Sequence, residues 1–123
     1  MQKDILPHHH GDASDIENLR QQLTEMNHFE TIADIFKELA DCSRIRIFWL
    51  LCHREECVIN ISSLVGMTSP AVSHHLRQLK SKGLIVSRRE GKETYYKAAS
   101  TSEASLLHEM IEKLARISCS QTN

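Results

Sequence analysis

Aromatic residues are scarce in this 123-residue chain, at 5%, and it has only four glycines and two prolines. Leucine, isoleucine, valine and alanine therefore supply most of the apolar content, a mixture that favours helices packed on helices over a large sheet. No apolar run approaches the roughly 20 residues that a membrane-spanning helix needs. The segment from Met1 to Gly11 is polar and does not resemble a secretion signal. We therefore expect a cytoplasmic protein with no membrane partner.

The sequence also lacks the short motifs that mark common enzyme classes. It contains no glycine-rich phosphate loop, no nucleophile elbow and no His-Glu-x-x-His zinc motif. Its length fits one domain with a real hydrophobic core. We therefore predict a binding protein and not an enzyme.

A net charge of −1 does not suggest a nucleic-acid partner, but the charges are unevenly distributed. The segment from Ser69 to Lys92 holds six basic residues and a single acidic one, Glu90, so the rest of the chain has a net charge of −6. A cationic segment on an acidic body is typical of a protein that binds a polyanion.

The pattern along the chain predicts three parts. Residues 1–13 show no apolar period and include His8, His9 and His10, which indicates a flexible arm. Residues 14–119 carry the periodic segments of one domain, and residues 120–123 form a tail. Within the domain, Ser14 and Glu17 form a capping-box pattern that predicts a helix to about Asn27.

Apolar spacing predicts the next two helices. An apolar face that includes Phe29, Ile32 and Phe36 indicates the first, which ends near Asp41. Ser43 is the expected cap of the second, Arg44–His53, which is apolar on nearly all sides and is therefore expected to be buried.

A helix-turn-helix is predicted next. A short helix, Ile61–Val65 with Asn60 before it, should end at Gly66 in the left-handed conformation. Ser69 is the expected cap of a second helix that extends to about Lys82, with Pro70 at its first position. Residues 84–89 and 94–98 are β-prone and are separated by Gly91, which predicts a hairpin wing.

The final helix, about Ser102–Ser118, has an apolar stripe with little chain left to cover it, formed by Ala104, Leu107, Met110, Ile111 and Leu114. A second copy of the chain is the natural cover. The predicted fold is therefore a mainly α, homodimeric winged helix-turn-helix with a small β-hairpin wing.

The predicted recognition helix and wing carry side chains suited to double-stranded DNA. Short hydroxyls and an imidazole near the helix N-terminus suit base edges, whereas basic residues farther along and on the wing suit phosphates. These candidates are Ser69, Ser73, His74, Arg77 and Lys80 on the helix and Arg88, Arg89 and Lys92 on the wing.

Four segments together resemble the ArsR/SmtB family of metal-responsive repressors over roughly residues 29–117. They are Leu39-Ala40-Asp41-Cys42-Ser43-Arg44-Ile45-Arg46-Ile47, Ser73-His74-His75-Leu76-Arg77-Gln78-Leu79, Gly83-Leu84-Ile85, and Arg89-Glu90-Gly91-Lys92 with Tyr95-Tyr96. The resemblance implies a homodimeric repressor that leaves operator DNA when it binds an inducer. It also implies that Ser69, Pro70, Ser73 and His74 occupy base-reading positions, although Pro70 offers only apolar contact.

Of the two metal sites known in the family, this chain lacks the ligands of one and retains a cysteine of the other. At the positions of the site on the last helix this chain has Ser100, Ser102, Lys113 and Arg116, which cannot bind zinc. The other site retains its cysteine as Cys57, which the arm residues His8, His9 and His10 could complete, with Cys52 as a spare thiolate. Thiolate and imidazole together suit zinc or another thiophilic divalent ion such as cadmium.

A thiol-based alternative uses no metal. Cys42, Cys52 and Cys119 could support a redox- or persulfide-responsive repressor of the same fold. Cys42 and Cys52 lie about 15 Å apart along one helix and cannot pair within it. A winged helix that only binds other proteins is a third alternative, against which the cationic wing argues.

The remaining histidines offer a weaker pattern. His108 and Glu112 lie four residues apart on the last helix and could supply two metal ligands, but not at the family's positions. His28 and His53 are interpreted as ordinary surface histidines.

Overall fold

A computed structural model describes residues 6–121, and the side chains of residues 6–118. Packing divides the chain into two compact units, and the boundary along the sequence falls between Asp34 and Ile35. The first contains α1 (Ile16–Glu25) and the start of α2 (Phe29–Glu38). None of the described helices is both long enough and apolar enough to cross a membrane.

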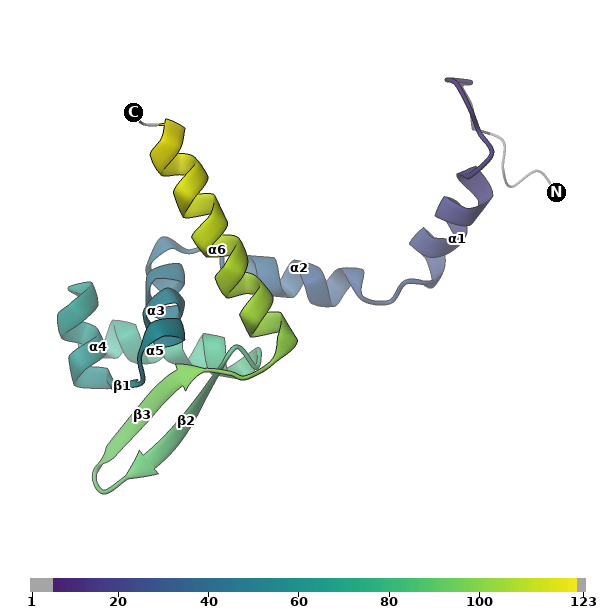
Figure 1. Cartoon of the computed structure of the whole chain (residues 1–123). Coiled ribbons are helices and arrows are strands. Elements are labelled where there is room, and N and C mark those ends of the chain that lie inside the picture. Colours follow the sequence, from purple (N-terminus) through teal and green to yellow (C-terminus); the bar gives the residue numbers. More distant parts are fainter. Residues whose placement is uncertain (1–5, 122–123) are drawn as a thin grey trace. The chain divides into compact units, whose positions relative to one another are not determined.

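The second unit has the helix order of a winged helix-turn-helix, shown in Figure 1. Its further helices are α3 (Cys42–His53), α4 (Val58–Val65), α5 (Ser69–Ser81) and α6 (Ser102–Gln121). Its strands are β1 (Glu56–Cys57), β2 (Ile85–Glu90) and β3 (Glu93–Ala98). The predicted fold class is confirmed.

The core of this unit lies between α3, α4, α5 and the start of the sheet. Ile47, Phe48 and Leu51 of α3 are buried, because this helix lies at the centre of the bundle. Val72, Leu76 and Leu79, which recur at helical spacing along α5, are also buried. Burial of these side chains fixes which face of α5 remains outside.

The three strands form one antiparallel sheet in the order β1-β3-β2. Glu90 pairs with Glu93, so Gly91 and Lys92 form a two-residue loop, and Gly91 has the positive φ of +62° that such a loop favours. Figure 1 shows the β2–β3 hairpin extending beyond the helices. The predicted wing is present, and β1 adds a third, short strand beside β3.

Several predicted helix starts are wrong by one to three residues. The cap of α3 is Asp41 and not Ser43, because the Asp41 carboxylate accepts a hydrogen bond from the backbone N–H of Arg44 at 3.0 Å. Likewise Thr68, and not Ser69, caps α5, so Pro70 occupies the second position and not the first. Helix α4 begins at Val58 and so precedes Asn60.

Helix α1 begins at Ile16 with no side-chain cap, so the capping box predicted at Ser14 does not form. The Ser14 backbone N–H and hydroxyl both donate to the Asp12 carboxylate instead. The expected end of α4 is confirmed, since Gly66 has φ +70° and ψ +39°.

Candidate nucleic-acid interface

The outer face of α5 presents the polar side chains predicted to contact DNA. Ser69, Pro70, His74, Arg77 and Lys80 are exposed, and Ser73 is half-buried beside them. They are outside because the apolar stripe of α5 is held in the core. Near the N-terminus of α5, the hydroxyls of Ser62 and Ser69 lie 3.1 Å apart, which links the two helices of the helix-turn-helix.

Lys80 connects the recognition helix to the wing. Its Nζ donates to the Ser87 hydroxyl of β2 at 2.7 Å. The ammonium has two further hydrogens, so this contact leaves it able to bind a phosphate. The contact also places the positive charge between α5 and the β2–β3 hairpin.

The three basic residues of the wing differ in their surroundings. Arg88 binds both oxygens of the Glu55 carboxylate, at 2.8 and 2.9 Å, and also pairs with Glu90. Its guanidinium lies 4.8 Å from the centre of the Tyr95 ring. The hydrogen bonds that Arg88 donates to these carboxylates raise the pKa of Arg88, and the ones that Glu55 accepts lower the pKa of Glu55.

Arg89 and Lys92, in contrast, lie at the exposed tip of the hairpin. Across the described residues, no carboxylate lies within ion-pair distance of either cation. The Arg89 Nε donates only to the carbonyl of Gly91, at 3.2 Å. Arg89 and Lys92 are therefore better placed than Arg88 to neutralise a phosphate.

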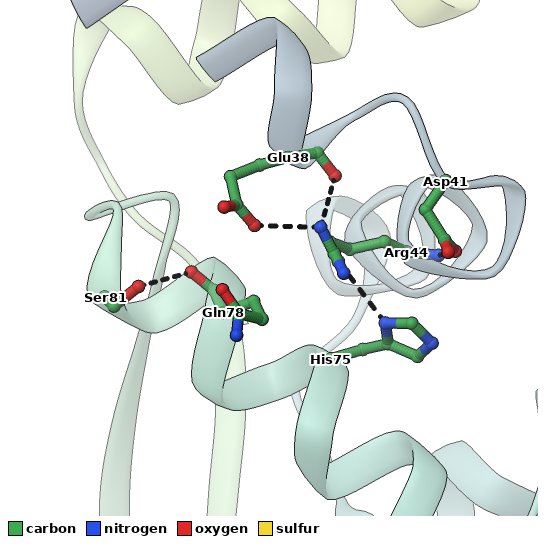
Figure 2. A network of polar contacts seen from close by, with 6 residues as sticks. All are labelled: Glu38, Asp41, Arg44, His75, Gln78 and Ser81. Atoms are coloured by element: carbon green, nitrogen blue, oxygen red, sulfur yellow. Dashed lines mark hydrogen bonds and ion pairs between the residues drawn. The ribbon is translucent and has the colours of Figure 1, made fainter. Parts of the chain in front are cut away.

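A partly buried polar network links α3 to α5 and to the end of α2, and sequence reasoning missed it. Figure 2 shows Arg44 of α3 between Glu38 and His75. Its Nη1 donates to the Glu38 carboxylate at 2.9 Å and to the Glu38 carbonyl at 3.2 Å, and its Nε donates to Nδ1 of His75 at 3.3 Å. Burial lowers the pKa of His75, which favours the neutral ring that can accept this bond.

The cysteines occupy different environments. Cys42 is exposed, Cys52 is half-buried and Cys57 is buried, and all three are free thiols. Burial, and secondarily the charge of Glu112, raises the pKa of Cys52 to about 11. The raised pKa leaves less of Cys52 as thiolate at neutral pH than an exposed cysteine would have. The side chain of Cys119 lies outside the described part of the chain.

The four residues at the positions of the family's metal site on the last helix lie at the surface, as expected for serine, lysine and arginine. Lys113 pairs with Glu109 at 2.9 Å, and Ser100, Ser102 and Arg116 are exposed. The arm histidines belong to the first unit, where the rings of His8 and His10 stack 6.0 Å apart. Beside Cys57 in the second unit, Asn60 donates to the buried Glu56 carboxylate at 2.8 Å.

Comparison with known proteins places this geometry among bacterial transcriptional regulators. Residues 41–87 match the family model described as "Bacterial regulatory protein, arsR family". A "Transcriptional repressor SmtB homolog" from Synechocystis is 32% identical over 102 residues, covering 80% of this chain and 77% of the relative. A "Cadmium resistance transcriptional regulatory protein CadC homolog" from Staphylococcus aureus is 33% identical over 82 residues, covering 66% and 67%.

Among solved structures, a homodimeric winged helix-turn-helix DNA-binding domain from Mycobacterium bovis superposes with a TM-score of 0.64. It is 29% identical and covers 88% of this chain and 91% of its own. It is described as a possible ArsR-family transcriptional regulator.

Proposed function

Because this chain belongs to the ArsR/SmtB family of transcriptional regulators, we propose that it is a cytoplasmic, homodimeric repressor released from operator DNA by a divalent metal ion. One observation carries the DNA-binding part. The winged-helix unit carries two features that suit DNA. One is the outer face of α5 with its serines and His74, and the other is the pair of cations at the tip of the wing, Arg89 and Lys92. The protein acts by binding and not by catalysis.

The proposed inducer is zinc or a more thiophilic ion such as cadmium. The ligands proposed from the sequence are the Cys57 thiolate and the imidazoles of His8, His9 and His10. Thiolate and imidazole form a donor set that both ions accept. Cys57 immediately precedes α4, the first helix of the helix-turn-helix, so a ligand bound there can bias the position of α5.

Metal should weaken binding to DNA from upstream of the coding sequence by about 5–150-fold, the usual range of allosteric coupling. Cys57→Ser, and separately the combined change of His8, His9 and His10 to Ala, should abolish that response while leaving metal-free affinity unchanged. Fluorescence anisotropy with labelled DNA, with and without zinc or cadmium, measures both quantities. If both variants respond to metal like the parent protein, the proposed ligand set is wrong.

Most of the stripe expected to face a partner is covered within the chain itself, because Ala104 and Leu107 are buried and Met110 and Ile111 pack against the core. The proposed dimer rests instead on apolar side chains of α6 that remain exposed. Leu106, Leu114 and Ile117 lie along α6 and are 65%, 55% and 53% exposed in the single chain. Several large apolar side chains exposed along one helix are typical of an interaction surface. A two-fold interface covers such a face and sets two recognition helices about 34 Å apart, one turn of DNA.

Leu114→Glu and Ile117→Glu should therefore convert a micromolar dimer into a monomer, because each places a charge in an apolar interface. Sedimentation equilibrium measures the change. Val86→Glu is the matched control, since Val86 is also an exposed apolar residue but lies on the wing. A parent protein that sediments as a monomer at micromolar concentration would rule out the dimer.

A further inference from the structure

Three potential metal ligands converge where the end of α3 meets α6. His53 is the last residue of α3, and His108 and Glu112 lie four residues apart on one face of α6. The His53 Nε2 lies 3.0 Å from the Glu112 Oε1 and 3.2 Å from the His108 Nε2, and the remaining edge of this triangle is 3.1 Å. We propose that His53, His108 and Glu112 form a three-ligand site for a divalent ion of the zinc class.

Hydrogen bonds to Glu112 account for two edges of this triangle but leave the contact between the two imidazole nitrogens without a favourable interaction. Each imidazole Nε2 carries at most one hydrogen, and Glu112 is an acceptor when ionised. If both rings donate to Glu112, their two N–H groups converge on one oxygen, and the two like dipoles lie side by side with the nitrogens 3.2 Å apart. If one ring donates to the other, the lone pair of the accepting ring faces the carboxylate oxygen. A cation at the centre lets all three atoms use a lone pair.

The dimensions suit tetrahedral zinc. Bonds of about 2.0–2.1 Å at tetrahedral angles separate neighbouring ligand atoms by about 3.3–3.4 Å. The three edges of 3.0–3.2 Å need to lengthen by only a few tenths of an ångström. Two imidazoles and one carboxylate leave a fourth position open for water, and they favour zinc over ions that require sulfur.

Neighbouring side chains restrict the orientation of the three ligands but leave them accessible to an ion from solvent. The Trp49 Nε1 donates to the Glu112 Oε1 at 3.3 Å, and its ring packs against His53 with centroids 4.4 Å apart. Such outer contacts restrict the orientation of metal ligands. The side chains of His53, His108 and Glu112 are 44%, 31% and 33% exposed, so the site opens to solvent.

This site shares no residue with the Cys57 site, and its occupation does not depend on the proposed function. It uses neither Lys113 nor Arg116, which stand at the family's α6 positions. A bound ion would link α6 to α3, the helix whose Arg44 contacts α5. The two proposed sites also differ in chemistry, because only one contains sulfur.

The test uses the full chain with His8, His9 and His10 changed to Ala, so that the arm cannot bind metal. Zinc competition against a chromophoric chelator should show one ion per chain that survives Cys57→Ser. His53→Ala, His108→Ala and Glu112→Gln should each weaken binding of that ion by about 100-fold or more, since each removes a ligand. Glu109→Gln, which removes a neighbouring α6 carboxylate, and His28→Ala should leave it unchanged.

Cobalt supplies an independent readout. Co²⁺ in this site should give visible ligand-field bands without a near-ultraviolet thiolate charge-transfer band, and the bands should disappear with Glu112→Gln. Far-ultraviolet circular dichroism of each variant checks that the fold is retained. Zinc affinity that is unchanged in all three ligand variants, or a cobalt spectrum that requires Cys57, would overturn the proposal. Neither result would bear on DNA binding, which is measured separately.

Discussion

Replacing Arg44 with methionine is expected to lower the free energy of unfolding by about 3 kcal/mol, because it leaves a buried carboxylate without its cation. Glu38 is only 6% exposed, and Arg44 supplies both its ion pair at 2.9 Å and a hydrogen bond to its carbonyl. The same change removes the donor to His75 of α5. Urea denaturation followed by circular dichroism, at one fixed protein concentration, measures the loss.

Two further variants separate this explanation from a general effect of mutating α3. Arg46→Met changes an exposed arginine two residues away and should stay within about 0.5 kcal/mol of the parent protein. Glu38→Gln combined with Arg44→Met removes both charges and should recover much of the lost stability. Equal losses in Arg44→Met and Arg46→Met would show that the Glu38–Arg44 pair contributes no special stability.

The sequence predicted the fold well because the fold depends on features that lie within single elements. The spacing of Val72, Leu76 and Leu79 identifies the inner face of α5, and therefore also its outer face. The position of Gly91 between two β-prone runs identifies the hairpin. Each of these signals is complete within about 15 residues, so no knowledge of tertiary packing is needed.

Helix starts were less predictable, because neighbouring polar residues compete for the cap. Asp41 and Ser43 can both cap α3, as Thr68 and Ser69 can both cap α5. All four residues have a suitable acceptor oxygen. Backbone geometry decides between them, and that geometry depends on how the preceding segment packs. The sequence alone therefore places such a start only to within one or two residues.

The polar side-chain contacts between helices that are distant in sequence could not be predicted. Arg44 and His75 are 31 residues apart, and His53 and His108 are 55 apart. His53 gave no signal of its own and was interpreted as a surface histidine. The spacing of His108 and Glu112 did suggest a pair of ligands, but only the packing of α3 against α6 supplies the third.

Replacing Ser73 or His74 with alanine is expected to weaken binding to the specific operator by about 1–3 kcal/mol for each base interaction that the change removes. Both side chains lie in the N-terminal half of α5, where a recognition helix meets base edges. Binding to unrelated DNA should change little, since alanine leaves the phosphate contacts in place. Fluorescence anisotropy with operator and scrambled duplexes at one salt concentration gives both affinities.

Charge removal on the wing should have a different effect. Arg89→Ala and Lys92→Ala should weaken operator and scrambled DNA alike and reduce the salt slope by about one for each phosphate that is no longer neutralised. Arg88→Ala should change that slope less, because Glu55 and Glu90 already pair with Arg88. Ser81→Ala is a control at the far end of α5, where the hydroxyl donates to the Gln78 carbonyl. If Ser73→Ala and His74→Ala bind both duplexes like the control, then α5 does not read the operator through these residues.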